Sequence, residues 1–291
     1  MESTKTTFRD PITLVKTSFN ALINHPIILF PFFVSVFIQL VVLEFLYFSA
    51  RFPLVVFFGP IIRRLWGEGF LHYPLNIILL PKLFYYAQLF VYIFIGAFLT
   101  AVAALIIRAI NNERKITFQE AVREAVPYYI HIFTASLIFL GTLKGFYAVY
   151  DIIFKRALLI RSKVGIFGFI KAVLVGGAPY YQFFIAILVT ALFAFLIPVI
   201  VIERKKIFAA LIENFKRLQR LFIIVFIAVF LPMLLYIPVL LLRNSVSSSE
   251  GITLPEIHVL IVVVGVFVTL FIDAIALTAV TTLYLADSEK T

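Results

Sequence analysis

The composition of this 291-residue chain excludes a fold that lies entirely in water, because 63% of the residues are hydrophobic, 14% are charged and the mean hydropathy is +1.09. A formal net charge of +10 would suggest a nucleic-acid partner for a soluble protein, but here Lys and Arg stand between apolar runs, where anionic lipid headgroups are nearer. The absence of cysteine excludes disulfides, thiolate metal sites and a cysteine nucleophile. We therefore expect the lipid bilayer and its anionic headgroups as partners, and no nucleic acid.

Six apolar segments are long enough to cross a bilayer as helices. A spanning helix needs about 20 apolar residues, and its backbone must satisfy its own hydrogen bonds because lipid offers none. The segments are 27–50, 83–110, 128–150, 180–202, 221–242 and 257–286. The third contains His131 and Lys144 but is otherwise apolar and aromatic. The sequence therefore predicts an all-α fold, a polytopic membrane helical bundle with six transmembrane helices, in a single membrane domain over residues 1–291.

Short helices with one apolar and one polar face are predicted directly before the first, third and fifth spans. These segments are Pro11–Asn24, Ile116–Val126 and Arg204–Gln219. Such a helix is typical of the membrane interface rather than of a crossing. Each is followed by a span, a connection and a second span, and this order predicts three repeat units, 12–115, 116–206 and 207–286.

The third amphipathic segment shows the pattern most clearly. Phe208, Ile212 and Phe215 fall on one face at helical spacing. Glu213 and Arg217, with the other charged residues of the segment, lie mostly away from that face. We expect the apolar face to contact the bilayer and the charged face to meet headgroups and water.

An even number of spans places both termini and the three amphipathic helices on one side of the membrane. That side carries 14 of the 25 Lys and Arg residues. The positive-inside rule assigns the more basic side to the cytoplasm. The sequence therefore predicts a multi-pass protein of the cell membrane, inner or plasma, with cytoplasmic N- and C-termini.

Two sequence stretches carry a family resemblance. The stretches are Pro198–Glu203 (PVIVIE) followed by Ala209–Lys216 (AALIENFK), with a weaker echo at Ser18–Pro26 (SFNALINHP). Together with the order of helices, they resemble an uncharacterised bacterial and archaeal family that includes the membrane domain fused to glycerophosphodiester phosphodiesterases. The resemblance implies a six-helix bundle without known chemistry. The residues of a phosphodiesterase domain are missing here, so the resemblance does not imply that activity.

Asp273 is unusual because it lies near the middle of the last span, where a carboxylate costs about 2.5–3.5 kcal/mol. Gly265, Thr269 and Ala276 share its helical face, which predicts that Asp273 faces protein rather than lipid. It is either a proton- or cation-coupling carboxylate or a structural Asp that hydrogen-bonds between helices. The sequence favours the structural role, because no intramembrane basic partner is evident at its depth.

Small and polar residues form comparable stripes in the second span of the other two units. They are Gly96, Thr100 and Ala104 in the first unit and Gln182, Ala186, Thr190 and Ala194 in the second. Small residues permit close helix packing, and their recurrence predicts that the even-numbered spans line the centre of the bundle. The candidate intramembrane polar or coupling residues are Asp273, Thr269, Gln182, Thr190 and Thr100.

The connections of the first two units contain apolar pieces too short to span, Phe52–Ile62, Tyr73–Pro81 and Val164–Pro179. Interrupted apolar segments at matching places in repeats indicate a transport site. The alternative is re-entrant or interfacial loops that seal one face of the bundle. Basic side chains nearby either clamp an anionic headgroup or form a solvated fringe. They are Arg63, Arg64, Lys155, Arg156, Arg161, Lys163 and Lys171.

No motif for an enzyme, a cofactor or a metal site occurs in the sequence. The leading hypothesis is therefore a non-enzymatic integral membrane protein, either a structural or accessory subunit of a membrane assembly, with membrane protein partners, or a lipid-organising scaffold. The alternative is a transporter or flippase for an anionic or lipid-like substrate, which requires a polar cavity that reaches Asp273.

Overall fold

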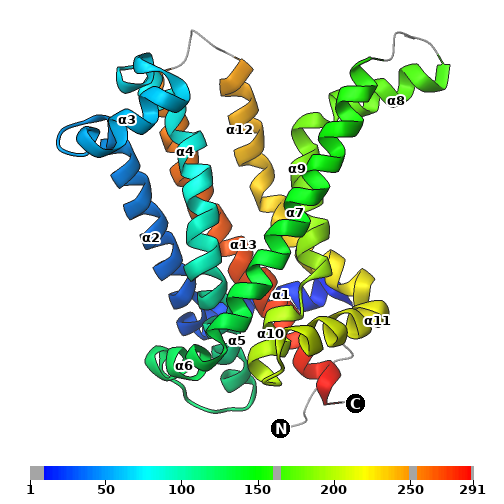
Figure 1. Ribbon diagram of the computed structural model, residues 1–291. Coiled ribbons are helices and arrows are strands. Elements are labelled where there is room, and N and C mark those ends of the chain that lie inside the picture. The colour runs from blue at the N-terminus through cyan, green and yellow to red at the C-terminus, as the bar shows by residue number, and fades with distance from the viewer. Residues whose placement is uncertain (1–9, 160–164, 249–253, 290–291) are drawn as a thin grey trace.

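The computed structural model describes residues 10–159, 165–248 and 254–289 (Figure 1), and every regular element in these ranges is a helix. Six helical segments are long and apolar enough to cross a membrane, which confirms the predicted number of spans. They are Pro26–Ala50, Leu75–Asn111, Phe118–Leu158, Tyr180–Ile202, Ile207–Val246 and Glu256–Ser288. The protein is therefore a helical, multi-pass membrane protein by length and composition.

Thirteen α-helices follow one another along the described residues. The first five are α1 (Pro11–Asn24), α2 (Phe30–Tyr47), α3 (Val55–Trp66), α4 (Leu75–Val91) and α5 (Ala97–Asn111). The next five are α6 (Phe118–Ala125), α7 (Tyr129–Leu158), α8 (Gly165–Gly176), α9 (Ala178–Leu192) and α10 (Leu196–Ile202). The last three are α11 (Ile207–Met233), α12 (Ile237–Ser248) and α13 (Glu256–Ser288). A five-residue π-helical turn, Tyr92–Gly96, joins α4 to α5 within one span.

Local capping explains where two of the short helices begin. Asp10 caps α1, where its carboxylate accepts a hydrogen bond from the Ile12 amide at 3.1 Å and Pro11 occupies the first helical position. Thr117 and Glu120 form a reciprocal capping box at the start of α6. Both caps satisfy amide groups that would otherwise lack partners at a helix start.

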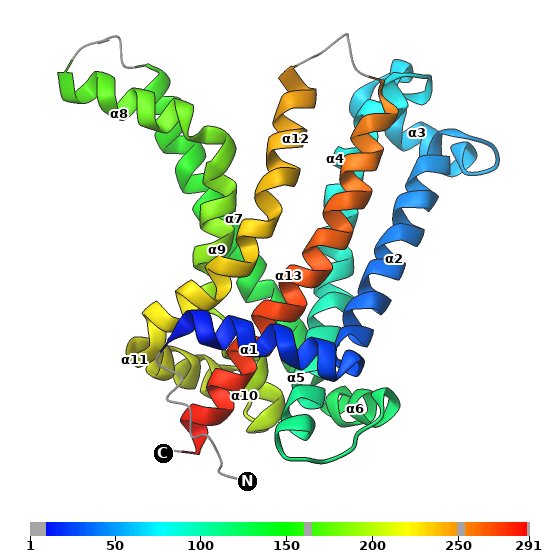
Figure 2. The ribbon, with the colours of Figure 1, turned by 180° about the vertical axis from the view of Figure 1, so that it is seen from behind.

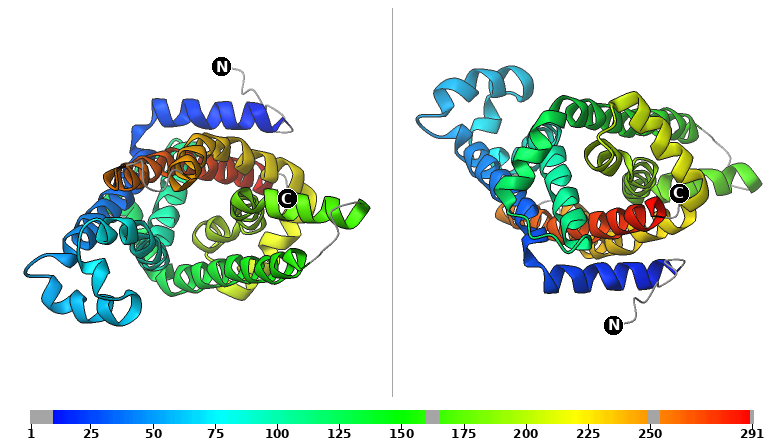
Figure 3. Two further views of the ribbon diagram at one scale, coloured as in Figure 1. Left: turned by 90° about the horizontal axis from the view of Figure 1, so that it is seen from above. Right: turned by 90° about the horizontal axis from the view of Figure 1, so that it is seen from below.

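The bundle has two different ends. At the end that holds α1, α6, α10 and the start of α11, which we call the terminal end, the helices are packed together and both ends of the described chain are found there (Figure 1). From behind, α1 lies across the bundle, where it packs on α11 and α13 (Figure 2). At the other end, the far end, α2, α3 and α4 lie on one side and α7, α8 and α9 on the other (Figures 1 and 3).

The buried fraction alternates between the odd-numbered and the even-numbered spans. In the second, fourth and sixth spans 50%, 56% and 39% of the most apolar stretch is buried, against 28%, 17% and 28% in the first, third and fifth. The even-numbered spans therefore lie more centrally, as the stripes of small residues predict. In α5, Ala101, Ala103 and Ala104 are completely buried, and α5 packs against α2, α6, α7, α10 and α13. Small side chains permit this close approach of several helices.

Two predicted boundaries were wrong. Tyr73–Pro81 is not a separate broken segment, because α4 begins at Leu75 and continues past Pro81 into the second span. The third amphipathic segment is not a separate helix either, because α11 runs from Ile207 to Met233 without interruption. In each case the backbone hydrogen bonds continue across a boundary that composition alone suggested.

The remaining short pieces form helices at the far end. Phe52–Ile62 contributes to α3, and within Val164–Pro179 the residues Gly165–Gly176 form α8 while Ala178 and Pro179 begin α9. Figures 1 and 2 show α3 and α8 beyond the ends of the spans, on opposite sides of the bundle. Of the two alternatives that the sequence left open, their position favours interfacial rather than re-entrant segments.

The cysteine-free chain permits a direct test of the two ends. Single cysteines introduced by Gln119→Cys and Ser288→Cys stand at exposed positions of the terminal end, and Arg64→Cys stands at the far end. In sealed vesicles, a membrane-impermeant maleimide should label the first two from the same side and the third from the opposite side. Labelling of all three from one side would contradict the six-span arrangement.

Candidate functional site

A buried arginine holds the terminal end together. The Arg217 side chain, on α11, is only 8% exposed and donates hydrogen bonds to Glu203 at 2.7 Å, Glu213 at 2.8 Å and Asp287 at 3.3 Å. The carboxylates come from the turn after α10, from α11 itself and from the end of α13. A guanidinium group has five N–H donors in a planar fork, and here they serve three acceptors at once.

Two further side chains complete this cluster, which we call the Arg217 network. Lys205 pairs with Glu203 at 2.6 Å and with Glu213 at 3.2 Å, and the hydrogen bond that it donates to Glu203 is the main cause that raises the pKa of Lys205. The Tyr284 hydroxyl donates to Glu203, while its ring lies 4.6 Å from the Arg217 guanidinium carbon. The network therefore combines charge-assisted hydrogen bonds with a cation–π contact.

Asn214, one turn before Arg217 on the buried face of α11, secures the break between α9 and α10. Its side chain is completely buried, accepts from the Phe195 amide at 3.1 Å and donates to the Leu192 carbonyl at 2.9 Å. These two backbone groups lie where the helix is interrupted and would otherwise lack partners. Glu213, Asn214 and Arg217 of α11 thus find their partners inside the protein.

This helix departs from the expected orientation only on part of its charged face. Phe208 and Ile212 are 79% and 71% exposed, while Glu213 and Arg217 face the other helices. The apolar side points outward and this part of the charged side inward, as a helix at a membrane requires when its polar groups have protein partners. The signal in the sequence was the spacing of Glu213, Asn214 and Arg217, which places an acid, an amide and a cation on one helical face.

Asp273 lies on the inner side of α13. The exposed apolar residues Leu260, Val264, Phe267 and Phe271 follow one another at spacings of three or four and mark the outer face of this helix. At about 100° per residue, Asp273 lies about 150° away from the middle of that face. Asp273 is nevertheless exposed, although its neighbours Ile272 and Ala274 are buried. The carboxylate therefore points away from the exposed apolar face of α13, and its predicted contact with protein stays a prediction.

Tyr92 is near enough to Asp273 for an electrostatic interaction between the two groups. Tyr92 is the first residue of the π-helical turn, a feature that is frequent at functional sites. The Tyr129 hydroxyl on α7 donates to the Phe94 carbonyl of this turn at 3.0 Å, so α7 stabilises it. Sequence reasoning did not identify Tyr92, because nothing in a single sequence signals a π-turn.

The other intramembrane candidates do not join Asp273 in one site. The Thr269 hydroxyl donates to the Val266 carbonyl and the Thr100 hydroxyl to the Gly96 carbonyl, each at 2.9 Å within its own helix. Thr100 lies on α5, which packs on α13, whereas Gln182 and Thr190 lie on α9, which packs on α7 and α11. Gln182 is exposed. The predicted set is thus split between the two sides of the bundle.

The predicted headgroup-binding residues form two groups at the far end. Arg63 and Arg64 end α3, and Arg63 pairs with Glu68 at 3.1 Å. Lys155 and Arg156 end α7, and Lys171 lies on α8, on the opposite side of the bundle (Figure 3). Arg161 and Lys163 lie outside the described residues. These residues therefore do not converge on one headgroup.

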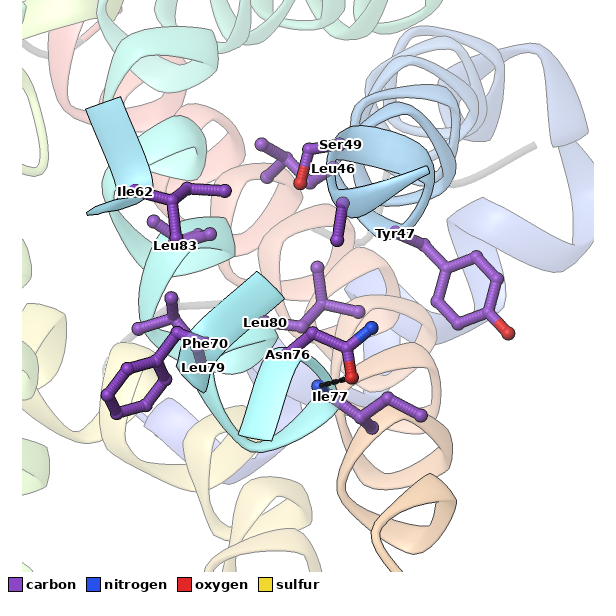
Figure 4. A pocket seen from close by; sticks show the side chains of 11 residues that line it. Leu46, Tyr47, Ser49, Ile62, Phe70, Asn76, Ile77, Leu79, Leu80 and Leu83 are labelled. Carbon is purple, nitrogen blue, oxygen red and sulfur yellow. Dashed lines mark hydrogen bonds between the residues drawn. The ribbon is translucent and has the colours of Figure 1, made fainter. Parts of the chain in front are cut away.

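A cavity at the far end is too small to bind a substrate. It lies between α2, α3 and α4, where Leu46, Ser49, Ile62 and Asn76 are among its lining residues (Figure 4). Its volume of about 10 Å³ is at the lower limit for a single water molecule. The Asn76 side chain already accepts a hydrogen bond from the Ile77 amide at 2.9 Å.

Comparisons with known proteins add no assignment: no family model, curated protein or solved structure matches this chain. Among the described residues, no group of three His, Asp or Glu side chains is arranged to hold a metal ion. The functional assignment therefore depends on the geometry of the spans and their polar groups.

The Arg217 network predicts a large difference between two neighbouring arginines. Arg217→Met should lower the free energy of unfolding by about 3–5 kcal/mol, because it leaves buried carboxylates without their cation. Arg220→Met removes a 55% exposed side chain that is 3.6 Å from Asp287 and should cost about 0–1 kcal/mol. Thermal unfolding in detergent measures both variants, and equal losses of stability would contradict a structural role for Arg217.

Proposed function

We propose that this protein is a transporter or flippase for an anionic or lipid-like substrate, with Asp273 as its proton- or cation-coupling carboxylate. The observation that carries the proposal is the position of Asp273, which is exposed on the inner face of a membrane-spanning helix. A carboxylate at that depth is tolerated where it meets water or protein partners, and such residues mark transport pathways.

The unequal ends of the bundle support this proposal. The Arg217 network joins α10, α11 and α13 at the terminal end, while at the far end α12 lies between the group of α2, α3 and α4 and the group of α7, α8 and α9 (Figure 1). Alternating access requires a pathway that is closed at one end when it is open at the other. In this proposal, the terminal end is the closed end of such a pathway.

Tyr92 supports a coupling role for Asp273. A tyrosine hydroxyl that comes within hydrogen-bond distance of a carboxylate is able to donate to its ionised form and to accept from its protonated form, and Tyr92 interacts electrostatically with Asp273. The π-helical turn that carries Tyr92 is bonded to α7, on the other side of the bundle. Protonation of Asp273 would therefore be sensed by helices on both sides of the pathway.

A scaffold or accessory subunit is the second candidate, and the exposed apolar face of α1 favours it. Ile12, Phe19 and Ile23 are 65%, 50% and 64% exposed and share one helical face, while Leu14 and Leu22 on the opposite face are buried. An amphipathic helix of this kind inserts its apolar side into the membrane interface. This function requires stable lipid or protein partners and no substrate movement.

The remaining sequence predictions concern the membrane topology, the repeat units and the family resemblance. We infer a cell-membrane protein with cytoplasmic termini, supported by the 14 of 25 basic residues assigned to that side. Three repeat units, each led by an interfacial helix, are supported by the common position of α1, α6 and the start of α11 at the terminal end (Figures 1 and 2). The resemblance to the phosphodiesterase-associated membrane domain stays a prediction.

The test is substrate movement in liposomes under an imposed pH gradient. The probe is a fluorescent anionic phospholipid, and its molecules in the outer leaflet are quenched by a chemical reagent. A pH dye trapped inside the liposomes records proton entry at the same time. Asp273→Asn keeps the size of the side chain and removes its charge, so it should reduce both signals about tenfold or more.

Glu44→Gln is the matched control, because Glu44 is another exposed carboxylate of a span, on α2. It should retain the wild-type rate. Absence of lipid and proton movement in folded wild-type protein would contradict the transporter proposal and favour the scaffold. Equal losses in both variants would contradict a specific role for Asp273.

A further inference from the structure

Three arginines gather at a second place on the terminal end, away from the Arg217 network. A pocket of about 130 Å³ lies between the end of α5, the loop that leads to α6, α6 itself and the turn after α10. A single water needs only about 10–15 Å³ on a comparable measure, so this pocket has room for a small anion. Its polar lining residues are Arg108, Asn112, Arg114, Glu124 and Arg204.

The charges of this pocket do not cancel. Glu124 is its one acidic lining residue, and it is shared by Arg108 at 3.9 Å and Arg204 at 3.7 Å. Both distances exceed those of a tight charge-assisted hydrogen bond, which are about 2.7–2.9 Å. Arg114 adds a third positive charge, so the lining carries a formal net charge of about +2 at neutral pH.

Another carboxylate that interacts with Arg114 is already engaged. Glu120, on the first turn of α6, acts electrostatically on Arg114, but its side chain accepts a hydrogen bond from the Thr117 amide at 2.9 Å as part of the capping box. It therefore serves the helix start rather than the pocket. The arginines retain N–H donors directed to no carboxylate at short range among the described residues.

The two turns that supply Arg114 and Arg204 are built alike. Each contains the tripeptide Glu-Arg-Lys after a buried helix, at 113–115 and at 203–205. Each also holds one non-glycine residue in the left-handed region, Glu113 at φ 55° and Arg204 at φ 56°. In the first turn, the Arg114 amide donates to the Ala109 carbonyl at 2.8 Å, which turns the chain back against α5. Such conformations are uncommon and cluster at ligand-binding sites.

We propose that this pocket binds a phosphate group through Arg108, Arg114 and Arg204. Guanidinium groups match phosphate oxygens with paired N–H donors, and a net charge of about +2 suits a phosphate dianion better than a single carboxylate. The ligand is either the headgroup of an anionic lipid or a soluble phosphate, since the pocket stands where spans end. This site is separate from Asp273 and does not depend on transport.

Calorimetric titration of the full-length protein tests this site in a non-ionic detergent without anionic lipid. The two probes are inorganic phosphate and dihexanoyl phosphatidic acid below its micelle concentration. Saturable binding of the lipid alone identifies a headgroup site, saturable binding of phosphate alone identifies a soluble ligand, and binding of both identifies the phosphate group as sufficient. No saturable binding of either probe would overturn the proposal.

Variants of the exposed arginines show whether binding is local. Arg114→Gln and Arg204→Gln should each weaken binding about tenfold or more, because each removes a paired donor to the phosphate. Arg123→Gln is the matched control: it removes the same charge from an exposed position of α6 that does not line the pocket, and binding should change by less than about twofold. An equal loss in this control would show attraction to net charge only and would overturn the assignment.

Discussion

The terminal end of this bundle depends on one requirement, that a buried guanidinium must have partners. An unpaired ion costs several kcal/mol out of water, so Arg217 is stable only where Glu203, Glu213 and Asp287 surround it. Because these carboxylates come from different segments, satisfying one side chain brings the turn after α10, α11 and the end of α13 together. The position of α1, which packs on α11 and α13, follows from this arrangement.

Polar contacts contribute more to helix association here than in a soluble bundle. Lipid tails are as apolar as leucine, so the hydrophobic effect gives little driving force for association in the bilayer. The alanines of α5 bring its neighbours close enough for dispersion contacts. Within the spans, the Gln88 amide donates to the Gln39 side chain at 2.8 Å and joins α4 to α2. Close packing and a few satisfied polar groups therefore hold the helices that the terminal end first brings together.

The sequence predicted the features that the thickness of the bilayer determines, and it missed the contacts between residues that are far apart in the chain. Six spans follow from hydrophobic length, whereas the direction expected for Asp273 from the small residues on its helical face stays a prediction. The inward direction of Arg217 was missed, because two of its partners, Glu203 and Asp287, stand 14 and 70 positions away and a helical wheel shows only its own helix. The pocket of Arg114 and Arg204 was missed for the same reason.

The Arg217 network also bears on how a pathway through Asp273 would open at the terminal end. Separation of α13 from α11 would break the bond from Arg217 to Asp287, yet Arg217 would keep Glu203 and Glu213, and Glu203 would keep Lys205. Arg220, whose side chain is 55% exposed, is long enough to follow Asp287. Because every charge retains a partner, opening avoids the cost of an isolated buried ion. The same cluster is therefore suited both to close this end and to release it.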